Sequence, residues 1–154
     1  MNLDQGNAPR TAATRHRVIA EAHLVALDSG RVLLTRRCNT AYGNGHWHLP
    51  SGHLEPGESI TATLIREAKE ELGITLAEDS IEFAHVMHRD DDAGRMGFFW
   101  TAAEWEGTPA ILEPDKCDGL DWFLIDRLPE PMIDYHQQAL TEIQAGRTFS
   151  QMGW

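Results

Sequence analysis

The chain has 154 residues and a formal charge of −11, with 24 acidic against 13 basic side chains. This length suits one domain with a sizeable core. The negative charge argues against a broad surface for polymeric nucleic acid or for an anionic membrane. A small nucleotide is still compatible with this charge, because a bound metal ion can invert the local sign.

The cysteines and the absence of apolar runs indicate the compartment. Cys38 and Cys117 are the only cysteines, and two distant cysteines make neither a disulfide framework nor a zinc site, so we expect reduced thiols. No long apolar run is present, and the first residues lack the apolar stretch of a signal peptide. We therefore expect a cytoplasmic protein without a membrane segment.

The secondary structure can be predicted in chain order. Polar residues 1–16 predict a flexible tail, which leaves 17–154 as a single domain. Runs of β-branched and aliphatic residues between Gly, Asn and Asp turns predict strands. These strands cover 18–27, 31–37, 47–50, 81–88, 96–105 and 120–125, and two helices are expected over about 60–72 and 133–145. Strands on both sides of a central helix, with a late helix, imply an α/β layered domain.

Each predicted helix has an apolar face. Ser59 is a suitable N-cap for the first helix and Gly73 a natural left-handed residue at its end. The buried positions expected for that helix are Leu64, Ile65, Ala68 and Leu72. In the late helix, the residues expected near one face are Ile133, Gln137, Leu140 and Ile143.

The most informative segment is 52–74, GHLEPGESITATLIREAKEELGI. Helical spacing puts Glu67, Glu70 and Glu71 on one face, where like charges destabilise the helix unless a cation lies among them. Hard carboxylate oxygens suit Mg²⁺ or Mn²⁺. The segment therefore predicts a metal site for phosphate chemistry. The alternative is a solvated helix with i,i+4 pairs such as Arg66 with Glu70.

The same segment resembles the Nudix box of the Nudix hydrolase superfamily. That box reads Gly, five residues, Glu, seven residues, Arg-Glu, an apolar residue, any residue, Glu-Glu, any residue, Gly and an apolar residue. The matching positions are Gly52, Glu58, Arg66, Glu67, Ala68, Glu70, Glu71, Gly73 and Ile74, with Ala68 the weakest fit. The resemblance implies an α/β/α sandwich with a mixed central sheet, and an enzyme that hydrolyses a nucleoside diphosphate linked to another group.

The resemblance also implies roles for individual residues. The metal ligands would be the carboxylates of Glu67, Glu70 and Glu71 and the backbone carbonyl of Gly52, with Glu58 as a further acid near the metal. Arg66 would orient these carboxylates. The general base would be Glu67 or Glu70, or else Glu113 in a late loop, Glu113-Pro114-Asp115-Lys116-Cys117, which is similar to one in MutT-like enzymes. The alternative for Glu113 is an ordinary loop acid.

Substrate contacts are harder to predict. Arg36 and Arg37 end a strand and point to opposite faces, so at most one of them is expected to reach a phosphate, and Lys116 is a second phosphate candidate. An aromatic side chain could hold the base. Trp122 is the candidate chosen from Trp47, Phe98, Trp100 and Trp122, each of which is also a plausible core residue.

The resemblance to the MutT-like group predicts hydrolysis of a purine nucleoside triphosphate, normal or modified, to a monophosphate and pyrophosphate. A hydrolase of ADP-ribose or another nucleotide sugar is one alternative. A non-catalytic nucleotide-sensing module is another, and an acidic helix that binds a basic partner is a third. The C-terminal residues 149–154 are apolar for a free end and are expected to dock on the domain or on a second subunit, so a homodimer is a further hypothesis.

Overall fold

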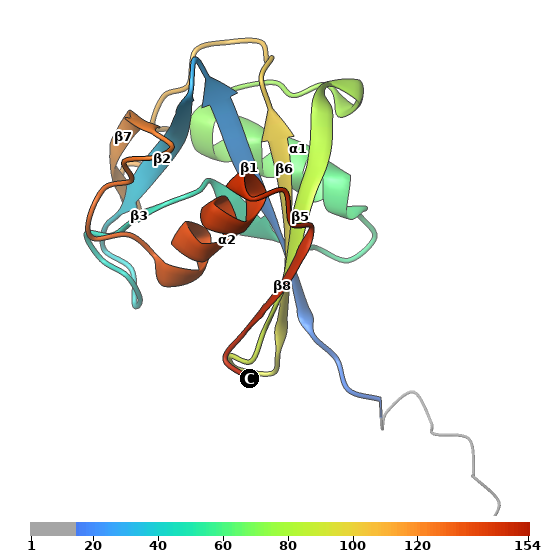
Figure 1. Ribbon diagram of the computed structural model, residues 1–154. Helices are drawn as coiled ribbons and strands as arrows, with labels where there is room; N and C mark the ends of the chain where they lie inside the picture. The colour runs from blue at the N-terminus through green and yellow to red at the C-terminus, as the bar shows by residue number, and fades with distance from the viewer. Residues whose placement is uncertain (1–14) are drawn as a thin grey trace, which may run out of the picture.

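The computed structural model describes residues 15–154, so most of the tail predicted over 1–16 lies outside the described part. The chain alternates strands with two α-helices and one short 3-10 helix, η2 (Glu78–Ser80) (Figure 1). The strands are β1 (Ile19–Asp28), β2 (Arg31–Arg37), β3 (Trp47–His48), β4 (Ser51–His53), β5 (Ile81–Arg89), β6 (Arg95–Ala102), β7 (Cys117–Leu124) and β8 (Phe149–Met152). The helices are α1 (Ile60–Leu72) and α2 (Asp134–Gln144).

The strands form one mixed sheet that forks. The order is β3-β2-β1-β6-β5-β8, with β4 paired to β1 and β7 paired to β2. β1 runs parallel to β6, and β5 runs parallel to β8. β1 pairs with β2 only at its end, through Leu27 and Asp28, whereas residues 21–23 pair with β4 instead. β2 therefore diverges from β1 beyond this short paired end (Figure 1).

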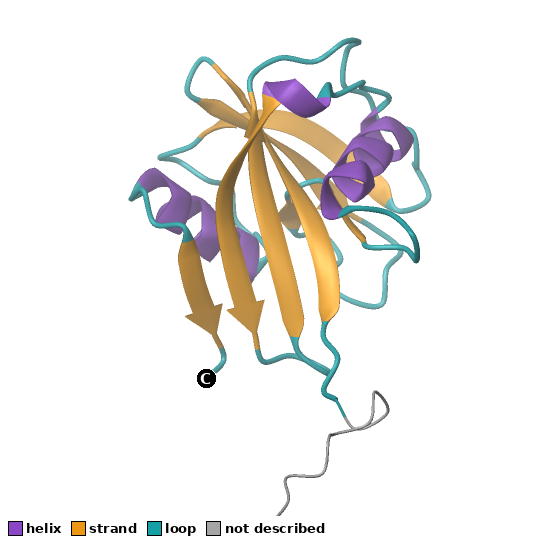
Figure 2. Cartoon of the chain, turned by 90° about the vertical axis from the view of Figure 1, so that its right-hand side faces the viewer, coloured by secondary structure: helices purple, strands orange, loops and turns teal. Residues whose placement is uncertain are grey.

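The two α-helices lie on opposite sides of the sheet: in Figure 1, α2 lies in front of the strands and α1 behind them, and in Figure 2 they flank the strands. One core cluster lies under α1 and includes Leu24, Leu33 and Leu64. The other lies under α2 and includes Leu49, Phe99 and Leu140. The predicted α/β/α sandwich with a mixed sheet is confirmed. No helix of residues 15–154 is long and apolar enough to cross a membrane.

Local signals placed α1 correctly. The Ser59 hydroxyl accepts a hydrogen bond from the Ala62 N–H, and Gly73 ends the helix at φ 72°. Leu64, Ala68 and Leu72 are buried as predicted, whereas Ile65 is only partly buried. The phase predicted for the late helix was wrong at one position. His136, Ala139 and Leu140 face inward, and Gln137 is exposed.

The C-terminal segment docks on its own domain. Residues 149–152 form β8 against β5, a strand that the sequence did not predict. The buried His85 ring bonds to this end of the chain at both nitrogens, Nδ1 to the Arg147 carbonyl (2.8 Å) and Nε2 to the Ser150 hydroxyl (2.7 Å). Trp154 stays 71% exposed. The expected docking on the domain is thus confirmed, and a homodimer remains a hypothesis.

Candidate functional site

The acidic side chains predicted as a metal site gather between α1 and β4. Glu67, Glu70 and Glu71 project from α1, and Gly52 lies beside them on β4. A Cβ built on Gly52 would overlap the carboxyl group of Glu67, so the close approach of strand and helix requires glycine at this position. The Ser51 N–H donates to Glu71 Oε2 at 3.2 Å and ties the same strand to the helix.

Arg66 is the cation among these acids. Its Nε and Nη2 donate to both carboxylate oxygens of Glu58, at 3.0 and 2.7 Å. Its Nη1 donates to Glu67 at 2.8 Å and to Glu70 at 3.3 Å, and Nη2 also reaches the His53 carbonyl at 3.3 Å. The Arg66 hydrogen bond lowers the pKa of Glu58 to about 2. Arg66 therefore has the contacts of an organising residue.

Two of the acids are held in conditions that oppose their ionisation. Burial, followed by the charges of Glu67 and Glu113, raises the pKa of Glu71 well above its usual value. Burial also raises the pKa of Glu67, against the hydrogen bond from Arg66. Glu113 thus lies close enough to act electrostatically on both, and the Leu112 N–H donates to the Glu71 carbonyl at 3.2 Å. The predicted late-loop acid is next to the cluster, while its role as a base stays a prediction.

The chemistry of this cluster fits a hard divalent cation. Like charges that raise one another's pKa would be relieved by a cation, and carboxylate and carbonyl oxygens are the donors that Mg²⁺ and Mn²⁺ prefer. Among residues 15–154, no three His, Cys, Asp or Glu side chains already form a group that could hold a metal ion. Arg66 engages three of the carboxylates instead. The donor types that such a cation requires are therefore present between α1 and β4.

A cavity of about 650 Å³ opens on the other side of β4. Ser51, Gly52 and His53 line it, so this short strand is the wall between the cavity and the acidic cluster. The volume lies within the range of about 300–1,000 Å³ that is typical of small-molecule sites. The cavity lining includes Glu21 of β1, Arg37 of β2 and Tyr135 of α2.

Residues 16–143 of the chain match the family model of the NUDIX domain. The chain belongs to this family. A MutT Nudix hydrolase structure from Burkholderia pseudomallei is 29% identical with a TM-score of 0.74, over 81% of this chain and 97% of that one. The 8-oxo-dGTP diphosphatase of Escherichia coli strain K12 is 29% identical over 56% of this chain and 66% of that protein.

A second kind of relative is longer than the chain. The NAD-capped RNA hydrolase NudC of Stutzerimonas stutzeri strain A1501 is 27% identical, over 72% of this chain and 38% of that protein. The chain therefore spans well under half the length of this relative. The similarity covers 117 residues, and the rest of that protein lies outside the matched region.

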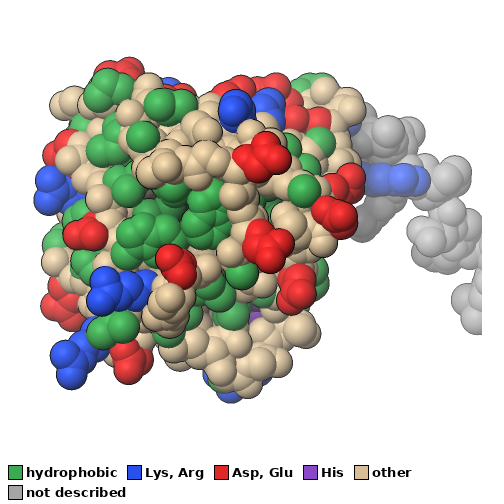
Figure 3. Space-filling view, turned by 90° about the horizontal axis from the view of Figure 1, so that it is seen from above, with side chains coloured by type: hydrophobic (Ala, Val, Ile, Leu, Met, Phe, Trp, Pro, Cys, Tyr) green, Lys and Arg blue, Asp and Glu red, His purple; other side chains and the backbone are tan. Residues whose placement is uncertain are grey.

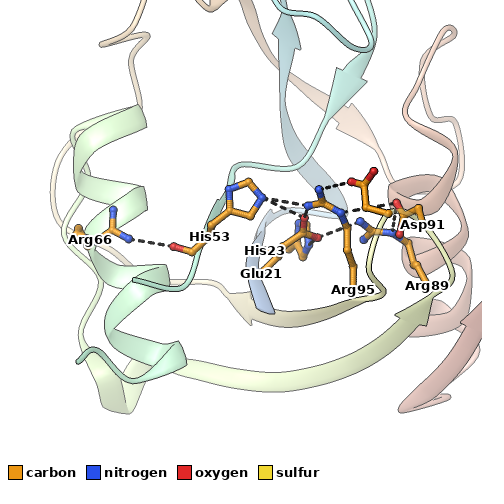
Figure 4. A network of polar contacts seen from close by, with 8 residues as sticks. Glu21, His23, His53, Arg66, Arg89, Asp91 and Arg95 are labelled. Atoms are coloured by element: carbon orange, nitrogen blue, oxygen red, sulfur yellow. Dashed lines mark hydrogen bonds and ion pairs between the residues drawn. The ribbon is translucent and has the colours of Figure 1, made fainter. Parts of the chain in front are cut away.

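A buried ion network forms the side of the cavity away from α1 (Figure 4). Glu21, which is 5% exposed, accepts hydrogen bonds from Arg89 Nη2 at 3.1 Å and from Arg95 Nη1. Burial alone would raise the pKa of Glu21, but His23, Arg89 and Arg95 outweigh it and hold the pKa far below its usual value. His53 Nε2 lies 3.3 Å from the same carboxylate. The network thus joins β1, β4 and the β5–β6 hairpin around the cavity.

The buried His23 and His136 and the partly buried His48 lie close to this network. Burial and the charge of Arg37 lower the pKa of His48 to about 3, and burial lowers the pKa of His136 and of His23. His136 Nδ1 accepts from the Leu49 N–H at 2.8 Å, so its proton is on Nε2. The lowered pKa values favour the neutral form of these rings, and His48 and His136 are among the residues that line the cavity.

The Nudix fold separates the predicted substrate residues. Arg37 lines the cavity, and its Nε donates to the Tyr42 carbonyl at 3.0 Å. Arg36 points to the other face, where it bonds to Asp118 at 2.8 Å. The prediction that the two arginines diverge is therefore confirmed, and Arg37 is the one that reaches the cavity.

Two other predicted substrate residues lie away from the cavity. Trp122 stacks on Trp105 at 5.9 Å and packs against the α1-side core, and Lys116 is exposed on the loop that bonds to Cys38. Neither lines the cavity. The sequence reasoning missed Glu21, Arg89, Arg95, Tyr42 and Tyr135. A usable signal was Glu21, an acid inside an otherwise apolar strand, together with the arginines at both ends of the acidic hairpin loop.

Proposed function

We propose that the protein is a divalent-metal-dependent pyrophosphohydrolase that cleaves a purine nucleoside triphosphate, normal or modified, to a monophosphate and pyrophosphate. Family membership and the MutT and NudC relatives indicate a pyrophosphohydrolase. The observation that carries the proposal is the position of β4. One side of this strand faces the acidic cluster, and the other lines a cavity large enough for a nucleoside, so a pyrophosphate would lie beside the acids.

The residues divide the chemical work between them. When bound, Mg²⁺ or Mn²⁺ would neutralise charge on the phosphate oxygens and lower the pKa of a coordinated water. Glu67, Glu70 and Glu71, with the Gly52 carbonyl, would hold the cation, and Glu58 would support them through Arg66. Glu113, Glu67 or Glu70 would accept the proton of the attacking water.

Arg37 provides the phosphate contact in this proposal. Among residues 15–154, no carboxylate lies within 4.0 Å of its guanidinium, in contrast to Arg36, Arg89 and Arg95. Because Arg37 lines the cavity, its guanidinium is available to a bound anion. Lys116 and Trp122, which lie outside the cavity, receive no support from their positions.

The name of the Escherichia coli relative, an 8-oxo-dGTP diphosphatase, supports the choice of a purine triphosphate. The NudC relatives make the pyrophosphate of a dinucleotide a second candidate, and ADP-ribose or another nucleotide sugar stays a third. A nucleotide-sensing module without catalysis is the alternative from another class. We infer that the protein works on free nucleotides in the cytoplasm. Sedimentation at micromolar concentration that shows only monomers would reject the homodimer hypothesis.

The deciding experiment is a nucleotide panel. Canonical and modified nucleoside triphosphates, ADP-ribose, NAD and NAD-capped RNA are incubated with Mg²⁺, with Mn²⁺ or with chelator, and the products are identified. We expect pyrophosphate release from purine triphosphates that chelator abolishes. Glu67→Gln and Glu71→Gln should each lower kcat by about 10²-fold or more, the usual cost of removing an essential charged group.

Glu104→Gln is the matched control, because Glu104 is an exposed acid on the loop after β6 and is none of the proposed ligands or bases. Full activity in excess chelator, or activity on ADP-ribose or capped RNA alone, would overturn the proposal. A folded protein that binds nucleotides and hydrolyses none of the panel would favour the sensing module.

A further inference from the structure

Two tyrosines line the cavity, and they differ in what covers them. Tyr135, at the start of α2, is partly buried, and the Arg89 guanidinium lies 3.5 Å from its ring centroid. Tyr42, in the loop between β2 and β3, is 63% exposed. Large aromatic rings usually bury their faces, so an exposed ring at the mouth of a cavity marks a candidate ligand contact.

The loop that carries Tyr42 is fixed by its own hydrogen bonds. The Asn44 side-chain oxygen accepts from the Thr40 N–H at 2.7 Å and from its hydroxyl at 2.9 Å. The Tyr42 carbonyl accepts from Thr40 Oγ1 at 2.8 Å and from Arg37 Nε at 3.0 Å. The ring is therefore presented by an ordered loop, which reduces the entropy that a ligand must remove on binding.

Tyr42 also stands where two cavities meet. A smaller cavity of about 190 Å³ shares Tyr42, Tyr135, Arg89 and Asp91 with the main one. The Arg37 guanidinium carbon lies 6.0 Å from the Tyr42 ring centroid. A flat apolar surface thus lies beside a cation that has no carboxylate partner in the described residues, which matches the base and the phosphate of one nucleotide.

We propose that Tyr42 is the stacking platform for the nucleobase and that it sets a preference for purines. This inference rests on the proposed function, since it takes the ligand to be a nucleotide. Every nucleobase can stack on an aromatic side chain, and preferences among bases come from the strength of stacking. A purine has a larger π-face than a pyrimidine and should therefore stack more strongly on Tyr42. Tyr135 also lines both cavities, but the Arg89 guanidinium already lies over its ring.

Calorimetric titration with purine and pyrimidine nucleoside 5′-monophosphates tests this without any turnover. We expect Tyr42→Ala and Tyr42→Leu to weaken purine monophosphate binding by about tenfold or more, as the loss of one stacked base predicts. Pyrimidine binding should weaken less, so the ratio of purine affinity to pyrimidine affinity should be smaller in these variants than in the parent protein. Tyr42→Phe, which keeps the ring, should restore most of the affinity.

Phe149→Ala is the control, because Phe149 is 54% exposed on β8 and lines neither cavity. Purine affinity in Tyr42→Ala within about twofold of the parent protein would overturn the inference. So would a Tyr42→Phe variant as weak as Tyr42→Ala, or no saturable binding of either class of monophosphate. A protein that binds purines through Tyr42 and hydrolyses nothing would overturn only the proposed function. Turnover that is unaffected in Tyr42→Ala would overturn only the inference.

Discussion

At the scale of single residues, Glu71 is expected to lower the stability of the metal-free protein while it supplies a ligand of the proposed metal site. Burial and neighbouring carboxylates raise its pKa, so the folded protein binds this proton more tightly than the unfolded chain does. Above pH 4.5, the unfolded chain loses this proton more readily than the folded protein does, so the raised pKa of Glu71 lowers the free energy of unfolding. A divalent cation would reverse that penalty, which is why a metal site can tolerate it.

Glu71→Gln should accordingly stabilise the metal-free protein. With chelator at pH 7–8 we expect a gain of about 1–2 kcal/mol in unfolding free energy, or about 2–6 °C in Tm. The gain should decline as pH falls below the raised pKa of folded Glu71, and it should vanish near pH 4.5, where Glu71 of the unfolded chain is protonated as well. Thermal melts of both proteins from pH 4 to pH 8 measure this, with Glu104→Gln as control. An unchanged or lower Tm for Glu71→Gln at pH 8 would contradict it.

Arg36 and Arg37 provide an internal comparison at the same scale. They are adjacent on β2, yet Arg37 lines the cavity and Arg36 pairs with Asp118 on the other face. Arg37→Ala should raise KM for the nucleotide about 10-fold or more, since a charge-assisted bond to an anion contributes about 1.5–3 kcal/mol. Arg36→Ala should leave KM within about twofold. Steady-state kinetics on both variants decides, and the reverse ranking would move the phosphate to the other face.

At the scale of elements, β4 is the part on which the site depends. It pairs with β1 through Ala22 and Gly52, and it separates the acidic cluster from the cavity. The strand has only three residues, so its position is set by the sheet and by the approach of Glu67 rather than by its own length. A change in that approach should disturb metal binding before it disturbs the fold.

Gly52→Ala tests this point. The added methyl would occupy the space of the Glu67 carboxyl group and displace it. We expect kcat to fall by about 10-fold or more and the metal concentration for half-maximal activity to rise, because a displaced ligand weakens the site. Ser51→Ala, the neighbouring substitution that adds no atom, is the control. Metal affinity and kcat equal to those of the parent protein would show that Glu67 is not held by β4.

The same elements show what sequence could predict. α1 was predicted correctly because its signals are local: Ser59 as a cap, Gly73 as a stop and an apolar repeat between them. β4 and β8 were missed because their evidence is not local. Three or four residues carry too little pattern, and each exists through pairing with a strand far away in the chain. The Nudix box identified the acids. The divergence of β2 from β1 beside the cavity depends on long-range strand pairing, and no sequence motif predicts it.

At the scale of the whole molecule, the net charge and the site reinforce each other. The chain carries −11, and Asp and Glu side chains are spread over the face seen from above (Figure 3). Arg89 and Arg95 of the ion network are already paired with Glu21, so they do not offset the negative charge of the carboxylates on α1. Such a molecule repels anionic substrates at long range unless a cation is bound. Metal binding should therefore control both stability and substrate access.

Thermal stabilisation by Mg²⁺ should depend on pH in a defined direction. A ligand that binds only the folded state stabilises it by RT ln(1 + [L]/Kd), about 1 kcal/mol at a concentration of several Kd. Glu67 and Glu71 must lose their protons to bind the cation, and both have raised pKa values, so the Mg²⁺-induced rise in Tm should grow as pH increases from 5 to 8. NaCl at matched ionic strength accounts for screening of the net charge. An equal rise in Tm in NaCl, or an undiminished Mg²⁺-induced rise in Glu71→Gln, would contradict the prediction. Mg²⁺ would then act on the general surface charge instead of on the carboxylates of Glu67, Glu70 and Glu71.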